Sequence, residues 1–97
     1  MSDLQEIEAR LKENKNVLDE KYNVKEIGIF GSFVRGEQKE TSDLDILVEF
    51  KGRVSLFEVI RLERYLSELL GEKVDLVMKK SLKPRIGKHI LKEVVYV

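Results

Sequence analysis

The spacing of apolar residues along the chain predicts helices and strands in alternation. Apolar residues recur at intervals of three or four from Leu4 to about Tyr22, as on one face of a helix, and Ser2 with Gln5 has the pattern of a capping box before them. Three further helices are predicted: a short one from Ser32, one between a second capping box at Ser55–Glu58 and Gly71, and one from Pro84 to about Glu93.

Runs of apolar and β-branched residues between these helices predict the strands of a small sheet. The runs are Val24–Phe30, Asp43–Phe50, Lys73–Met78 and Val94–Val97. Side chains alternate between the two faces of a strand, so Asp43 and Asp45 point the same way while Leu44 and Ile46 point into the core. We therefore expect an α/β (α+β) fold, a small mixed β-sheet with helices packed on one face and the carboxylates on the other.

The paired aspartates indicate a metal site. Two carboxylates held on one face repel each other unless a cation lies between them. Oxygen ligands of this kind suit Mg²⁺ or Mn²⁺, so Asp43 and Asp45 are predicted metal ligands. The plainer interpretation is that Gly-Ser and Ser-Asp form ordinary turns and that the aspartates face water.

Gly31 and Ser32 follow the first predicted strand and have the composition of a phosphate site. A glycine there lets the backbone approach a ligand closely, and a serine at the start of a helix offers its hydroxyl and N–H groups to a phosphate. Arg35, one turn later, adds a bidentate phosphate contact or, nearly as readily, a surface salt bridge. Phosphate donors beside paired carboxylates favour phosphoryl or nucleotidyl transfer.

These motifs resemble a known signature. Gly31-Ser32, followed after ten residues by Asp43-Leu44-Asp45, is similar to the signature of the nucleotidyltransferase superfamily that includes DNA polymerase β. The Gly-Ser-Phe-x-Arg-Gly form and the short chain resemble the minimal nucleotidyltransferases, which are often antitoxins of HEPN-type toxins. The resemblance covers most of the chain, to about Met78, and implies the polymerase β-like fold.

The resemblance also implies roles for individual residues. Asp43 and Asp45 would bind Mg²⁺ or Mn²⁺, while Gly31, Ser32 and Arg35 would hold the triphosphate of ATP. The superfamily places a third carboxylate on a later strand, where it completes the metal site and draws the proton from the attacking hydroxyl. Asp75 takes that role here, although a single aspartate in a strand is also a common solvent-facing residue.

The implied function is metal-dependent transfer of AMP from ATP to a hydroxyl on a protein partner, a helical HEPN-type toxin. Two alternatives stay open. The domain is then either a non-catalytic antitoxin that neutralises its partner by forming a complex, or a nucleotidyltransferase of small molecules or nucleic acid, alone or as a homo-oligomer. The pattern leaves the acceptor and the base preference undecided.

The length and composition of the chain bear on its domain number, its possible metal ligands and its location. Ninety-seven residues predict a single domain over residues 1–97, and the absence of cysteine excludes a thiolate metal site. The start lacks the regions of a signal peptide and no apolar run suits a membrane, so we expect a cytoplasmic protein. A net charge of zero argues against a general nucleic-acid binder.

The last third of the chain is basic. The six Lys and Arg residues of the segment Lys79–Lys92 are opposed only by Glu93. We interpret this segment as a solvated helix face, or alternatively as a surface for phosphates, nucleic acid or an acidic partner. His89 has no neighbours at ligand spacing and is given a surface or capping role.

Overall fold

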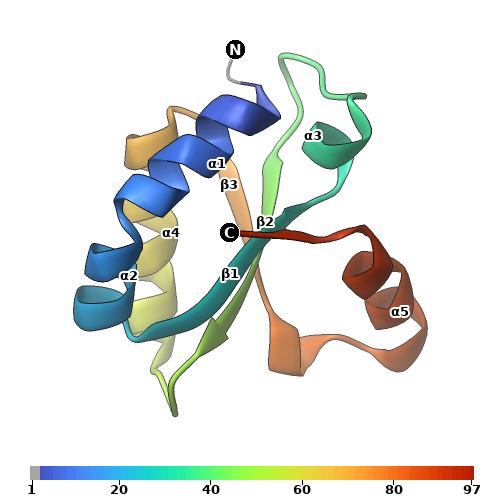
Figure 1. Cartoon of the computed structure of the whole chain (residues 1–97). Coiled ribbons are helices and arrows are strands. Elements are labelled where there is room, and N and C mark those ends of the chain that lie inside the picture. The colour runs from blue at the N-terminus through green and yellow to red at the C-terminus, as the bar shows by residue number, and fades with distance from the viewer. Residues whose placement is uncertain (1–2) are drawn as a thin grey trace.

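The computed structural model describes residues 3–97 and contains a four-stranded mixed sheet in the order β3-β2-β1-β4. Strand β1 is antiparallel to both β2 and β4, whereas β2 and β3 are parallel. In chain order the elements are α1 (Leu4–Glu13), α2 (Lys15–Tyr22), β1 (Val24–Phe30), α3 (Ser32–Arg35), β2 (Leu44–Phe50), α4 (Leu56–Leu70), β3 (Val74–Met78), the 3-10 helix η1 (Lys79–Ser81), α5 (Pro84–Glu93) and β4 (Val95–Tyr96) (Figure 1).

The core lies between the sheet and the helices α1, α2 and α4. Figure 1 shows these three helices on one side of the sheet and α5 on the other. Alternate residues of β2 enter the core, and its fully buried side chains include Leu44, Ile46 and Val48. The alternation therefore leaves the residues between them, Asp45 among them, to face away from the core, which confirms the predicted fold class.

The predicted first helix is divided in two at Asn14, and this boundary was wrong in the sequence interpretation. The Asn14 N–H donates to the Leu11 carbonyl at 3.2 Å, its side-chain amide donates to the Arg10 carbonyl at 2.8 Å, and the Tyr65 hydroxyl donates to its Oδ1 at 3.2 Å. An asparagine side chain that bonds to backbone groups in this way competes with the helix. The helix is capped by Asp3, and the capping box predicted at Ser2 lies outside the described residues.

The other predicted elements are present within one or two residues of their expected ends. Both halves of the Ser55–Glu58 capping box form, and Gly71 ends α4 in the left-handed conformation. Strand β2 begins at Leu44, so Asp43 immediately precedes the strand instead of opening it. No helix within residues 3–97 combines the length and the apolar character needed to cross a bilayer.

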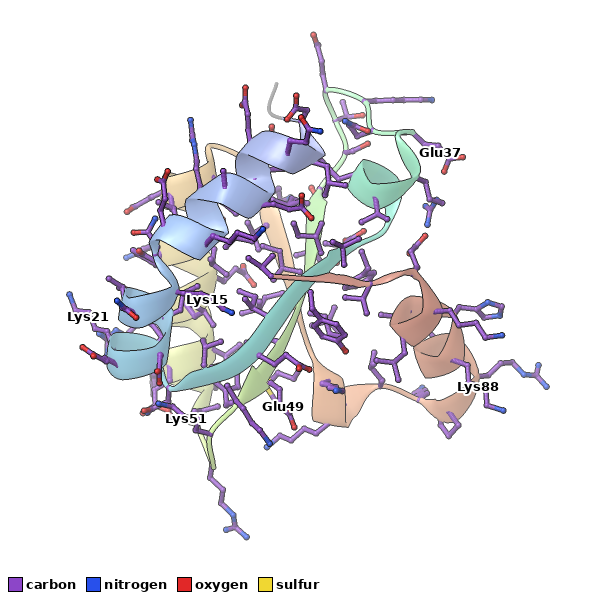
Figure 2. The ribbon with its side chains drawn as sticks, viewed as in Figure 1. Lys15, Lys21, Glu37, Glu49, Lys51 and Lys88 are labelled. Carbon is purple, nitrogen blue, oxygen red and sulfur yellow. The ribbon has the colours of Figure 1, made fainter. Side chains whose placement is uncertain are left out.

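The C-terminal region makes two kinds of contact with the sheet. A Cβ at Gly28 would lie 2.6 Å from Val94 Cγ2, so the glycine in β1 makes room for the end of the chain. In the basic segment, Lys79 pairs with Glu26 of β1 at 3.2 Å, whereas Lys88 on α5 points away from the sheet into solvent (Figure 2).

Candidate active site

The strand register brings two of the predicted carboxylates to neighbouring positions. Asp45 in β2 is paired with Asp75 in the parallel strand β3 and with Phe30 in β1. Parallel partners project to the same face, so Asp45 and Asp75 lie side by side on the surface opposite the core. Asp43 and Asp75 are exposed, while Asp45 is partly buried.

Asp45 is the electrostatic centre of this group. Its pKa is raised from 3.8 to about 6, first by burial and then by the negative charges of Asp75 and Asp43. Arg35 acts in the opposite direction. Burial and like charge both disfavour the ionised carboxyl group, so Asp45 has a strong tendency to accept a positive partner.

Gly31 connects the Gly-Ser turn directly to this carboxylate. Its φ of +83° suits only glycine well, and a Cβ at this position would run into Oδ2 of Asp45. The sequence suggested that the glycine admits a ligand. The structure adds a reason within the chain, because the backbone at the start of α3 packs against the Asp45 side chain. Ser32, the first residue of α3, is partly buried next to it.

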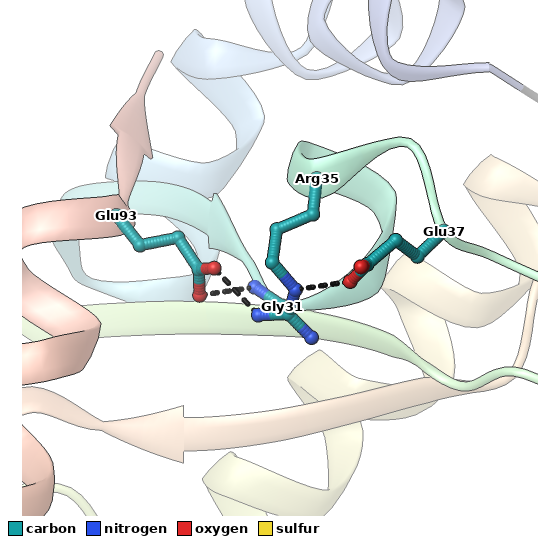
Figure 3. A network of polar contacts seen from close by, with 4 residues as sticks. All are labelled: Gly31, Arg35, Glu37 and Glu93. Carbon is teal, nitrogen blue, oxygen red and sulfur yellow. Dashed lines mark hydrogen bonds and ion pairs between the residues drawn. The ribbon is translucent and has the colours of Figure 1, made fainter.

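A residue that the motif did not include completes the site. Oε2 of Glu93, at the end of α5, accepts the Gly31 N–H at 2.9 Å, and its Oε1 accepts Nη1–H of Arg35 at 2.5 Å (Figure 3). The Nε–H of Arg35 donates to Glu37 at 2.6 Å. Glu93 lies 62 residues from Gly31, and the sequence showed it only as the single acid within a basic segment.

These contacts also set the charge states around Arg35. Burial raises the pKa of Glu93, but the hydrogen bonds from Gly31 and Arg35 outweigh it and leave that pKa below its usual value. The hydrogen bonds to Glu37 and then Glu93 raise the pKa of Arg35. Both groups are therefore ionised near neutral pH, and the predicted phosphate-binding arginine is already paired with two carboxylates.

The site opens into a cavity of about 450 Å³ between the sheet, α3 and α5. Its lining residues are Phe30, Gly31, Arg35, Asp45, Ile86, His89, Ile90 and Glu93. Helix α5 thus supplies an apolar wall and the single histidine, which the sequence had given only a surface or capping role. Ser32, Asp43 and Asp75 are not among the lining residues.

The carboxylates fit a divalent ion that binds together with a nucleotide. In residues 3–97, no three His, Cys, Asp or Glu side chains converge closely enough to hold a metal by themselves. Mg²⁺ usually takes one or two carboxylates and completes its octahedral shell with substrate phosphates and water. Asp45, whose neighbours Asp43 and Asp75 raise its pKa, provides the hard, negatively charged oxygens that such an ion needs.

Comparison with known proteins identifies the family of this chain. The profile of the family described as "Nucleotidyltransferase domain" matches residues 11–97. The protein adenylyltransferase MntA of Thermococcus cleftensis is 58% identical over 97 residues, which cover 100% of this chain and 98% of that protein.

Solved structures give the same result. The structure of a proposed minimal nucleotidyltransferase matches with a TM-score of 0.82 at 35% identity, over 97% of this chain and 95% of the other. A chain in a crystal structure of a toxin-antitoxin pair with AMP-PNP matches with a TM-score of 0.72 at 25% identity, over 90% of this chain and 70% of the other. As its Gly-Ser and Asp-x-Asp signature predicts, this chain belongs to the nucleotidyltransferase domain family and, within it, to the minimal nucleotidyltransferases.

Proposed function

We propose that this protein is a metal-dependent protein adenylyltransferase that transfers AMP from ATP to a hydroxyl group of a partner protein. The observation that carries the proposal is the direct packing of Gly31 against Asp45, with Asp75 at the paired position of the next strand. This packing joins a phosphate-binding turn to a carboxylate group within one small surface. The name of the relative from Thermococcus cleftensis, a protein adenylyltransferase, supports the choice of AMP and of a protein acceptor.

In this proposal one set of residues binds the nucleotide and its metal ion, and another residue acts on the acceptor. Gly31 and Ser32 hold the triphosphate through N–H and hydroxyl groups at the start of α3, and Arg35 adds its guanidinium. Asp43 and Asp45 would hold Mg²⁺ or Mn²⁺. Such an ion would neutralise phosphate charge and lower the pKa of the attacking hydroxyl.

Asp75 serves as the base that receives the proton of the acceptor hydroxyl. The freed oxygen forms a bond to the α-phosphorus of ATP, the bond from that phosphorus to the bridging oxygen breaks, and pyrophosphate leaves. Asp75 is exposed, so an acceptor carried by another protein reaches it from solvent. Protonation of Asp75 would also reduce the repulsion that it exerts on Asp45.

We further propose that the acceptor is a helical toxin of the HEPN type, silenced by the AMP group. The motif resemblance to antitoxins of such toxins supports this partner, as does the likeness to a chain from a toxin-antitoxin pair crystallised with AMP-PNP. The exposed basic residues of α5, including Arg85 and Lys88, are a candidate docking surface beside the cavity.

The test is co-expression with the product of the adjacent gene, followed by intact-mass spectrometry and incubation with α-labelled ATP. We expect the partner to gain the mass of one or more AMP groups in the presence of Mg²⁺. The variant Asp45→Asn should abolish the transfer, and Glu68→Gln, which removes an exposed carboxylate from α4 on the far side of the sheet, should preserve it.

The alternatives give different results in the same experiment. A stable complex without added mass would indicate an antitoxin that acts by binding alone. Label on RNA or on a metabolite, with no bound protein, would indicate a different acceptor. Either result would contradict the proposed transfer to a protein.

A further inference from the structure

Glu93 ties the end of α5 to the segment from Gly31 to Arg35 through a part-buried bond to Gly31 and an exposed one to Arg35. The Glu93 side chain is 22% exposed, compared with 64% for Glu37, the other carboxylate on Arg35. Of these two carboxylates, Glu93 is the one that contacts both the Gly31 N–H and the guanidinium (Figure 3). Glu37 therefore pairs only with Arg35 among these groups, whereas Glu93 also binds the backbone of the Gly-Ser turn.

The groups that Glu93 occupies are the same donors that the proposed function assigns to the triphosphate. Carboxylates and phosphates use such donors alike, since both accept N–H hydrogen bonds and both pair closely with arginine. A single N–H hydrogen at Gly31 cannot serve two anions fully, and adjacent anions repel. Glu93 and a phosphate oxygen are therefore alternatives at Gly31.

The charge of Glu93 also acts against nucleotide entry. It adds to Asp75 and Asp43 in raising the pKa of Asp45, so its negative field reaches the carboxylate that would hold the metal. A triphosphate approaching Asp45 meets this fourth negative group unless the Glu93 side chain moves away. Its departure would free two donors and remove one repelling charge in a single step.

We propose that Glu93 is an internal competitor for the nucleotide, which holds the Gly31 and Arg35 donors until a triphosphate displaces it. The inference rests on the proposed function, because it requires the triphosphate to contact these two residues. Glu93 is the last residue of α5, whose Ile86 and Ile90 line the same cavity, so the competing carboxylate lies at the border of the proposed nucleotide site.

The variant Glu93→Gln tests this role. The amide oxygen still accepts the Gly31 N–H, but the charge that pairs with Arg35 is gone. We expect calorimetric titration to show that the variant binds tripolyphosphate and AMP-PNP, each with Mg²⁺, about tenfold more tightly than the unchanged protein, since a charge-assisted hydrogen bond no longer competes. The matched variant Glu37→Gln removes the exposed carboxylate from Arg35 and should change the affinity by less than about twofold.

Two further measurements separate competition from a general structural effect. Adenosine lacks phosphates, so its affinity should be the same for Glu93→Gln and the unchanged protein; an equal gain for adenosine would overturn the proposal. Glu93→Asp, with a carboxylate too short to reach both donors, should bind tripolyphosphate with an intermediate gain. Circular dichroism during urea unfolding checks that each variant is folded.

The outcome also distinguishes this inference from the proposed function. If the unchanged protein binds AMP-PNP and transfers AMP while Glu93→Gln binds no more tightly, or more weakly, Glu93 is not a competitor and the proposed function stands. If neither protein binds a triphosphate, both proposals are wrong.

Discussion

Replacement of Asp45 by asparagine should stabilise the protein in the absence of nucleotide, by an amount that depends on pH. The folded-state pKa of about 6 lies above the ordinary value of 3.8, so the folded protein holds this proton more tightly than the unfolded chain does. Stability is therefore lost as the pH rises from about 4 to above 6, where Asp45 must ionise beside Asp75 and Asp43. An asparagine has nearly the same shape and never ionises, so it escapes this loss.

The magnitude follows from the difference between the two pKa values. A rise from 3.8 to about 6 corresponds to roughly 3 kcal/mol for a charge fully shielded from solvent. Asp45 is only partly buried, and screening by water reduces the expected gain to about 1 kcal/mol. We expect the free energy of unfolding of Asp45→Asn to exceed that of the unchanged protein by this amount at pH 7.5. Near pH 4 the two free energies should be equal.

Urea unfolding followed by circular dichroism, in buffers from pH 4 to pH 8 with EDTA, measures this difference. Glu68→Gln, which removes one exposed negative charge far from the site, is the matched control and should show no such dependence on pH. A destabilised Asp45→Asn, or a gain that is equal at pH 4 and pH 7.5, would refute the reasoning that repulsion and burial at Asp45 work against the fold.

Three further predictions concern the same surface. Mg²⁺ together with ATP should raise the melting temperature more than Mg²⁺ alone, because the phosphates complete the coordination of the ion. Scanning calorimetry measures both melting temperatures, and an equal rise from Mg²⁺ alone would contradict this prediction. Ser32→Ala should weaken binding of a non-hydrolysable ATP analogue by about 0.5–1.5 kcal/mol, the contribution of one hydrogen bond, and unchanged affinity by titration calorimetry would remove Ser32 from the site. Gly31→Ala should lower the free energy of unfolding by about 1–3 kcal/mol, because alanine rarely adopts this backbone conformation and its Cβ would clash with Asp45. It should also weaken binding of the analogue more than Ser32→Ala does; the reverse order would mean that the phosphate is not held at this turn.

Much of the fold follows from local pattern, and the exceptions have physical causes. Strand β1 was predicted to the residue because its apolar positions end at Phe30, directly before Gly31. In the structure the φ of +83° at that glycine ends the strand. The division at Asn14 was missed because Ile7, Leu11 and Leu18 keep a helical spacing across it. The division is marked in the structure by the hydrogen bonds of Asn14 to two carbonyls of the first helix and by its contact with Tyr65, 51 residues away.

In the site, too, the residues of the local motif could be predicted from the sequence, whereas those placed by contacts between distant segments could not. Gly31, Asp43 and Asp45 belong to one short motif, and the alternation of β2 is enough to place Asp45 on the outer face. The position of Asp75 required the parallel register of β3 with β2, which the pattern suggested but did not fix. Glu93 was missed because a single glutamate after a basic segment does not indicate a contact with the Gly-Ser turn. Its role arises because α5 ends beside Gly31.

The packing of β2 explains how so small a domain tolerates a cluster of like charges. Leu44, Ile46 and Val48 are fully buried on one face of the strand, so its position is fixed by the core whatever the state of Asp45 on the other face. Repulsion at Asp45 then cannot relax by movement of the backbone and remains as a local tendency to bind cations. Arg35 supplies only part of the compensation, because it is already paired with Glu37 and Glu93. A divalent ion with a nucleotide would relieve the remaining repulsion, and for this reason ligand affinity and stability without ligand should vary in opposite directions when Asp45 is changed.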